Sequence, residues 1–341
     1  MIKKIFPAIG LAIIVILTSS IDAPASESPD PPKTVMVNAI SGVTTVVASD
    51  TVAAGTFNVE RVLCPAGTVA IGGGIDMDNV LTMQVTSSAP TFPNGDRLIS
   101  RPNGTNPAPN GWQATAFNQT ATPKDFKVAV ICAPLTEASA VVASDTVAGG
   151  TFNVERVLCP AGDIAVGGGI DMDNVLTMRI TSSAPTFSNG DRLISRPNGT
   201  NPAPNGWQAT ALNQTTNPKD FKVAVICAPL TEASTVVSSD TAAAGTFGVE
   251  RTTCPAGDVA VGGGIDMDNV LNMQVTSSAP IFSGDRLISR PNGTNPAPTG
   301  WQVTALNGAG TDQDFKVAAI CVQLETKLFV PMLMKEGHQA A

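Results

Sequence analysis

The chain contains the same stretch of sequence three times. Asp50, Asp145 and Asp240 open the three copies at a spacing of 95 residues. This period is too long for a solenoid unit that depends on its neighbours, and it matches the size of a small domain. We therefore expect each repeat to fold as an independent domain. The predicted domains are repeat 1 (42–135), repeat 2 (137–230) and repeat 3 (232–325).

The six cysteines occupy equivalent positions in the repeats, two in each copy. Fifteen connectivities are possible for six cysteines. The duplicated layout makes pairing within each repeat the simplest solution, and a loop of about 70 residues closed in this way adds roughly 4 kcal/mol in the chain-entropy model. A zinc site is disfavoured because the repeats contain no CxxC motif and no histidine. The predicted disulfides are Cys64–Cys132, Cys159–Cys227 and Cys254–Cys321.

The pattern within each repeat predicts an all-β fold. Apolar residues alternate with polar ones over short stretches, 31 glycines and 26 prolines punctuate the chain, and no stretch shows a helical period. Asn94-Gly95 is typical of a tight hairpin turn, and 102–111 reads as a long loop. We expect three tandem antiparallel β-sandwich domains with one disulfide each, and small β-barrels as the alternative. The strands expected in repeat 1 are 44–50, 56–64, 69–75, 81–87, 97–101, 111–118 and 126–132.

The two ends of the chain differ from the repeats. Residues 1–25 resemble a secretory signal peptide, with two lysines, an apolar run and Ala23-Pro24-Ala25 as the cleavage site; an uncleaved anchor is the less favoured alternative because the run is short. Residues 26–41 form a Pro-rich spacer. The tail, 326–341, contains an apolar run interrupted by proline, which predicts either a docked terminus or a role in surface retention.

The charge of the chain limits its partners. The formal net charge is −8, and it becomes −9 once Lys3, Lys4 and Asp22 are removed with the signal peptide. An acidic protein without basic clusters is a poor ligand for nucleic acid and for anionic membranes. We expect no nucleic-acid partner and no membrane insertion of the mature chain.

The residues that commonly carry out catalysis are scarce. His338 in the tail is the single histidine, so the repeats cannot form a Ser-His-Asp or Cys-His arrangement. The cysteines are expected to be oxidised. Carboxylate pairs such as Asp76 and Asp78 remain, but carboxylates alone are weak evidence for a glycosidase. We therefore predict that the protein is not an enzyme and has no catalytic residues.

Two groups of residues are candidates for ligand binding. The Asp-Met-Asp-Asn turns place oxygen ligands close together, as calcium prefers, although a solvated turn explains them as well; no other cofactor is expected. The tryptophan of each repeat follows the long loop and could stack on a sugar ring, although its alternation with alanines favours a place in the core. The calcium candidates are Asp76, Asp78, Asp171, Asp173, Asp266 and Asp268, and the ligand-binding candidates are Trp112, Trp207 and Trp301.

Several short motifs are similar to those of a known β-rich module. Cys64-Pro65-Ala66-Gly67, Gly72-Gly73-Gly74, Gly111-Trp112 and Ala129-Val130-Ile131-Cys132 resemble a module found in many secreted bacterial proteins. Ser88-Ala89-Pro90 and Asn118 belong to the same pattern. The resemblance covers each repeat entirely. It implies export and a disulfide-bonded β-domain, and it brings no established activity.

These observations favour a structural or adhesive role outside the cell. Tandem copies raise avidity for a polymeric ligand and add reach. We predict a secreted, non-enzymatic protein, extracellular or retained at the cell surface, whose partner is a surface polymer, a glycan or copies of itself. The alternative is a lectin-like protein that binds glycans through the long loop and the tryptophan.

Overall fold

Each repeat forms seven antiparallel β-strands, which confirms the all-β class. The computed structural model describes residues 40–325; the predicted signal peptide, nearly all of the spacer, the tail and His338 lie outside this range. Repeat 1 contains β1 (Thr44–Val52), β2 (Phe57–Leu63), β3 (Val69–Met77), β4 (Met83–Thr91), β5 (Gly104–Pro107), β6 (Gly111–Asn118) and β7 (Lys124–Ala133). Repeat 2 contains β8 (Ser139–Val147), β9 (Phe152–Leu158), β10 (Ile164–Met172), β11 (Met178–Thr186), β12 (Gly199–Pro202), β13 (Gly206–Asn213) and β14 (Lys219–Ala228). Repeat 3 contains β15 (Ala233–Ala242), β16 (Phe247–Thr253), β17 (Asp258–Met267), β18 (Met273–Ile281), β19 (Gly293–Asn295), β20 (Gly300–Asn307) and β21 (Gln313–Gln323).

The strands of one repeat form two facing layers. In repeat 1, β1, β7 and β3 make one layer and β2, β6 and β4 make the other. The two layers pack through contacts of β1 with β2, of β7 with β6, and of β3 with β4. Side chains from both layers, including Phe126 and Val128 of β7 and Ala114 of β6, are fully buried in the core. Each repeat is therefore a small sandwich, as its alternating pattern predicts.

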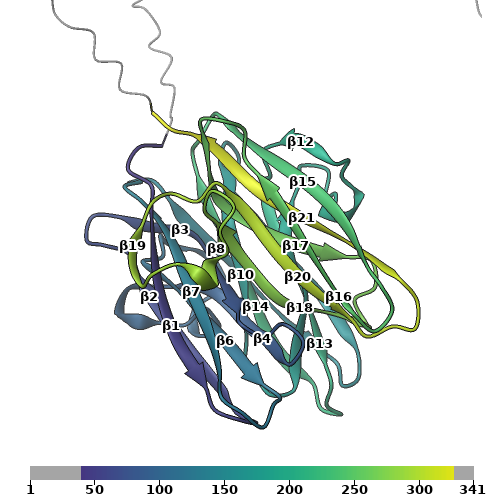
Figure 1. The fold of residues 1–341 in the computed structure, drawn as a ribbon. Helices are drawn as coiled ribbons and strands as arrows, with labels where there is room; N and C mark the ends of the chain where they lie inside the picture. Colours follow the sequence, from purple (N-terminus) through teal and green to yellow (C-terminus); the bar gives the residue numbers. More distant parts are fainter. Residues whose placement is uncertain (1–39, 326–341) are drawn as a thin grey trace, which may run out of the picture. The chain divides into compact units, whose positions relative to one another are not determined.

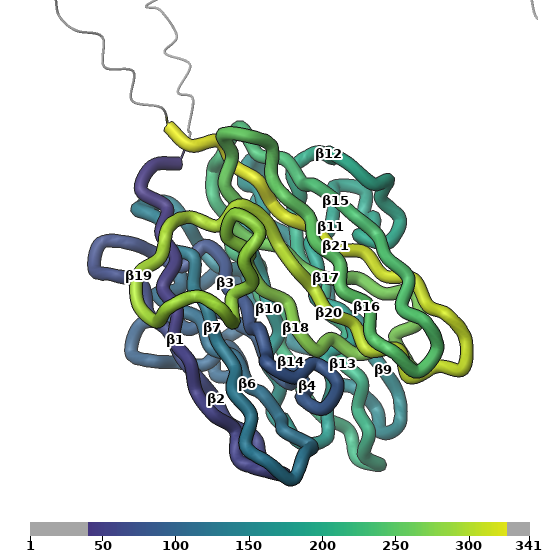
Figure 2. Tube along the Cα trace, viewed as in Figure 1, coloured from purple at the N-terminus to yellow at the C-terminus, as the bar shows by residue number. Residues whose placement is uncertain are grey.

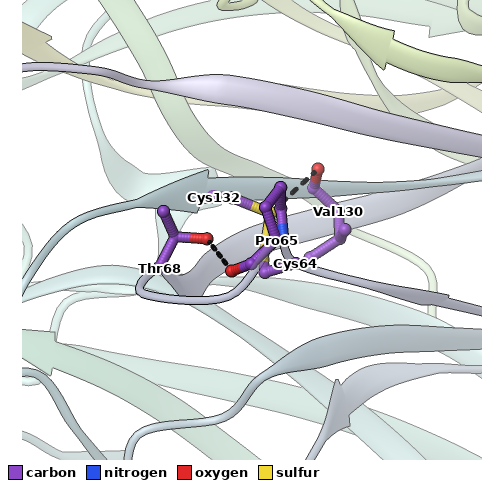
Figure 3. Close-up of a disulfide and its surroundings, with 5 residues drawn as sticks. All are labelled: Cys64, Pro65, Thr68, Val130 and Cys132. Carbon is purple, nitrogen blue, oxygen red and sulfur yellow. Dashed lines mark hydrogen bonds between the residues drawn. A yellow bond between two sulfur atoms is a disulfide. The ribbon is translucent and has the colours of Figure 1, made fainter.

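The disulfides join the two layers of each repeat. Cys64 directly follows β2 and bonds to Cys132 in β7, so the second strand is tied to the last (Figure 3). The turn beside it is closed by the hydroxyl of Thr68, which donates a hydrogen bond to the carbonyl of Pro65 at 2.7 Å. The equivalent bonds are Cys159–Cys227 and Cys254–Cys321, so all three predicted pairings are confirmed.

The sheets, however, do not end at the repeat boundaries. Each sheet has seven strands: three from the first layer of one repeat and four from the preceding repeat in the cycle. Strand β4 of repeat 1 pairs with β10 of repeat 2, β11 of repeat 2 with β17 of repeat 3, and β18 of repeat 3 with β3 of repeat 1. The repeats are therefore not structurally separate, because the inner edge strands of every sandwich are paired with a neighbour; whether one repeat folds alone is a question for an excised fragment. The three sheets are open, so the closed-barrel alternative is wrong.

The three repeats are related by a pseudo-threefold axis, and glycines allow the strands to meet there. A Cβ atom on Gly72 would lie 2.2 Å from the carbonyl oxygen of Val261 in repeat 3, and one on Gly73 would lie 2.4 Å from the indole of Trp112. The same contacts recur in repeats 2 and 3. Close backbone packing explains the triple glycine, and the ladder from β3 to β7 also shifts register there.

The structure differs from the prediction in two adjacent segments, the predicted strand 97–101 and the predicted loop 102–111. The segment 97–101 contains a 3-10 helix, Leu98–Ser100, instead of a strand. The loop that follows contains β5, which pairs with β8 of the next repeat as a short strap. Both segments contact the neighbouring repeat, which the sequence of one copy could not reveal. The predicted Asn94-Gly95 turn is confirmed, with φ angles of 73° and 78°.

The two ends of the described chain lie side by side, as the purple and yellow ends in Figures 1 and 2 show. Ile40 forms a parallel bridge with Leu324, its N–H donating to the carbonyl of Gln323 at 3.2 Å. The ring of repeats is therefore closed by contacts between its first and last segments. Within residues 40–325, no helix has the length and apolar character needed to cross a bilayer.

Candidate functional site

A buried aspartate forms the joint between every two repeats. Asp76 in β3 is fully buried, and it faces Arg286, which precedes the 3-10 helix of repeat 3. Arg286 donates from Nη2 to Oδ1 at 2.6 Å and from Nε to Oδ2 at 3.2 Å. The hydroxyl of Ser277 and the N–H of Ile288 complete the contacts from repeat 3, at 2.9 and 3.1 Å. The equivalent pairs are Arg97–Asp171 and Arg192–Asp266.

These joints do not favour the calcium hypothesis. With the N–H of Met77 at 3.0 Å, the carboxylate of Asp76 accepts five hydrogen bonds, so both oxygens are already fully used. Asp78 is exposed instead. Within residues 40–325, no group of three or more His, Cys, Asp or Glu side chains converges as metal ligands. We assign the buried aspartates of all three repeats a structural role; calcium binding by the exposed aspartates stays a prediction.

The arginines of these joints are structural residues that the repeat pattern does not predict. The pattern of 97–101 predicts a strand for the segment that contains the arginine, and nothing in a single copy indicates that its arginine pairs with another copy. A lysine reinforces each joint: Lys127 donates from Nζ to the carbonyl of Arg290 in repeat 3. The equivalent contacts run from Lys222 to Arg101 and from Lys316 to Arg196.

The tryptophans lie in the core and cannot stack on a sugar. Trp112 is 1% exposed, and its Nε1 donates to the hydroxyl of Ser88 at 3.0 Å. Trp207 and Trp301 are equally buried and make the equivalent bonds to Ser183 and Ser278. Trp112 and Trp207 line a cavity of about 20 Å³ to which all three repeats contribute residues. The hypothesis that they bind a ligand is wrong, and the core alternative is what the structure shows.

The exposed apolar side chains form a repeated surface. Within residues 40–325, every large exposed apolar side chain belongs to one of four equivalent positions: three on the edge strand β2 and its counterparts, and one in the turn before β4 and its counterparts. We call these residues on each edge strand, together with the arginine between them, the outer faces; in repeat 3 the third position is Thr253 instead of leucine. The outer face of repeat 1 comprises Phe57, Val59, Arg61 and Leu63; those of repeats 2 and 3 comprise Phe152, Val154, Arg156 and Leu158, and Phe247, Val249, Arg251 and Thr253.

The backbone N–H groups at the free edge of β2 are occupied by neighbouring side chains. The N–H of Val59 donates to the side chain of Asn58 at 2.9 Å, and the N–H of Arg61 donates to the carboxylate of Glu60. Edge strands whose backbone donors are occupied resist pairing with another strand. A partner would therefore contact the side chains of this face instead of extending the sheet.

The edge strands also carry a titrating group. Burial, and then the nearby charge of Asp50, raises the pKa of Glu60 above its usual range, and Glu155 and Glu250 are raised in the same way. A raised folded-state pKa means that the folded protein binds this proton more tightly than the unfolded chain, so ionisation costs stability at neutral pH. This destabilisation disappears as the pH falls through the raised pKa of the folded state to below 4.5, because the glutamate is then protonated in both the folded and the unfolded protein.

Replacing these three glutamates by glutamine should therefore raise the melting temperature at pH 7 and leave it unchanged near pH 3.5. Because the side chains are partly exposed, we expect about a few tenths of a kcal/mol per site. Glutamine keeps the acceptor for the neighbouring N–H, so only the charge changes. Thermal unfolding followed by circular dichroism across this pH range measures the effect, and a variant that melts lower at pH 7 would contradict it.

Comparisons with known proteins do not assign a function to the chain. No protein-family model matches the chain, and no curated protein matches its sequence. What the structure does show is three β-rich repeats, each with one disulfide, locked into a ring by buried Arg–Asp pairs.

Proposed function

We propose that the protein is a secreted, non-enzymatic structural or adhesive protein, which binds a repetitive polymer of the cell surface or matrix through its three outer faces. The observation that carries this proposal is the recurrence of exposed apolar side chains at equivalent positions of all three repeats. Exposed apolar side chains gathered on one surface mark sites of interaction. The resemblance of each repeat to a module of secreted bacterial proteins agrees with this setting.

The ring suits this role because it holds the three faces in fixed positions. Shared sheets, the Arg–Asp joints and one disulfide in each repeat leave little freedom between the copies. Three faces that bind at once raise the apparent affinity well above that of one face, and rigid placement lowers the entropy lost on binding. A polymer with regularly spaced units is the partner that benefits most from such an arrangement.

Glycan binding remains the second candidate, with a different set of residues. The buried tryptophans cannot take part, but each outer face presents a phenylalanine that is 41–43% exposed. An aromatic ring in that position offers a flat apolar surface to a sugar ring. The long loop, the other feature that suggested a lectin, is partly used for the strap formed by β5.

The decisive experiment measures binding of the labelled mature protein to intact cells and to their isolated envelope. Phe57, Phe152 and Phe247 are replaced by serine, first one at a time and then together. Because these side chains are exposed, each change should alter stability by no more than about 0.5 kcal/mol. We expect one substitution to weaken binding about tenfold and all three to weaken it at least about 100-fold, as loss of avidity predicts.

A second set of variants separates the two candidates. Asn103, Asn198 and Asn292 lie in the loops of the three repeats and are exposed. Replacing them by serine should leave binding unchanged if the outer faces are the contact, whereas a loop-based lectin would lose its ligand on a glycan array. A triple phenylalanine variant that binds cells as the natural protein does would refute the proposal.

A further inference from the structure

A pocket of about 180 Å³ lies where residues of all three repeats converge. Its lining includes Gln119 of repeat 1, Arg179 and Leu212 of repeat 2, and Leu271 and Gln274 of repeat 3. Arg179 lies in β11 and Gln274 in β18, and these two strands of neighbouring repeats contact each other. The pocket therefore exists only in the assembled ring.

The pocket contains an arginine without a partner. Arg179 occupies the position held by Gln84 in repeat 1 and Gln274 in repeat 3, so the cation breaks the symmetry. It makes no ion pair or hydrogen bond with any residue in the range 40–325, and its Nε is buried without an acceptor. Burial lowers the pKa of Arg179, but an arginine remains charged in proteins. An unpaired, partly desolvated guanidinium is stabilised when an anion binds to it.

A second difference between the repeats leaves an acceptor unsatisfied. In repeat 1, Gln119 donates from Nε2 to Oε1 of Gln84 at 3.1 Å. In repeat 3 the residue equivalent to Gln119 is Gly308, which also lines the pocket. Gln274 has consequently lost this donor, and its Oε1 is buried without a partner. The missing side chain at position 308 leaves space where the other two repeats have a glutamine.

Three leucines form the apolar part of the lining, which also includes Asn272 and Met273. Leu212 lies opposite Arg179 across the β11–β13 ladder, and Leu306 lies opposite Gln274 across the β18–β20 ladder. Directly opposed residues point to the same face of a sheet, so each polar group is flanked by a leucine. Leu271 adds a third apolar side chain. The pocket thus combines one cation, one free acceptor and three leucine side chains.

From this combination we infer that the pocket binds a small organic acid, whose carboxylate pairs with Arg179, whose hydroxyl or amine donates to Gln274, and whose apolar body contacts the leucines. A bidentate pair with a carboxylate satisfies the guanidinium, and the donor satisfies the buried carbonyl. The inference does not depend on the outer faces, because none of their residues lines this pocket.

The test uses the full mature chain and three related probes. Mandelate carries a carboxylate, a hydroxyl and a phenyl ring; phenylacetate lacks the hydroxyl; benzyl alcohol lacks the carboxylate. Titration followed by calorimetry and by nuclear magnetic resonance should show one saturable site for mandelate, with a Kd in the millimolar range or below. We expect phenylacetate to bind several-fold more weakly and benzyl alcohol at least about tenfold more weakly.

Two variants distinguish binding inside the pocket from non-specific attraction of the acid to the charge of Arg179. R179Q introduces the glutamine that repeats 1 and 3 carry, and G308Q introduces the glutamine that repeats 1 and 2 carry, so both should fold. We expect R179Q to lose at least about tenfold in affinity and G308Q to lose binding while its arginine remains. The inference is overturned if mandelate does not bind, if R179Q binds it unchanged, or if G308Q retains full affinity. Equal affinity for mandelate and phenylacetate would overturn the role of Gln274.

Discussion

Replacing Arg286 by methionine is expected to lower the free energy of unfolding by about 3–5 kcal/mol. The change removes the cation that neutralises Asp76, whose carboxylate is buried at the contact between repeats 3 and 1. Methionine is similar in length to the aliphatic part of arginine, so the main effect is a buried charge without its partner. Urea unfolding followed by tryptophan fluorescence, with disulfides intact, measures the change.

The double variant R286M/D76N provides the control. Asparagine removes the buried charge and keeps one oxygen that can accept from the hydroxyl of Ser277, so stability should recover in part. Arg97→Met tests the equivalent joint between repeats 1 and 2, which the chain also connects covalently. Losses below about 1 kcal/mol in both arginine variants would show that the joints do not hold the ring together.

An excised repeat 2, residues 137–230, is expected not to fold as a monomer. Alone, β10 loses its pairing with β4, β8 loses the strap β5, and Asp171 loses Arg97. The disulfide can form, but glycines that normally pack against neighbouring backbones would face water. We expect a monomer that lacks native near-ultraviolet circular dichroism and is cleaved rapidly by protease.

The same fragment should assemble into a trimer at higher concentration. Repeat 2 carries both Arg192 and Asp171, so one copy can donate to the next and three copies can close a ring. Sedimentation at several concentrations, with circular dichroism on the same samples, distinguishes the states. A folded monomer at micromolar concentration would contradict the expectation and restore the picture of independent domains.

How much of this fold the sequence could predict is clearest from individual elements. The strands 44–50, 69–75 and 111–118 lie in β1, β3 and β6, because alternation and flanking turns identify strands locally. Segment 97–101 is wrong because its backbone follows contacts to the neighbouring Asp171 instead of its own β-propensity. The strap β5 was missed for the same reason, since a Pro/Asn/Gly stretch reads as a loop until its partner strand is known.

The candidate site was less predictable. Alternation showed that Phe57, Val59, Arg61 and Leu63 share a face of their strand, but a period of two does not say whether that face is inside or outside. Asp76 was noticed as a possible oxygen ligand, although its real partner is an arginine 210 residues away. The unpaired Arg179 was visible as a difference between copies, but its pocket requires three repeats in contact.

The sequence by itself determined the triplication, the all-β class, the disulfide pairs and the Asn-Gly turn, because each follows from local chemistry or from the copied layout. The tertiary structure alone decided which copy each strand pairs with and how the aspartates are neutralised. The physical reason is the near identity of the copies. A contact within one repeat and the same contact between two repeats join identical residue types, so their sequence signals are the same and only the packing of the whole chain separates them.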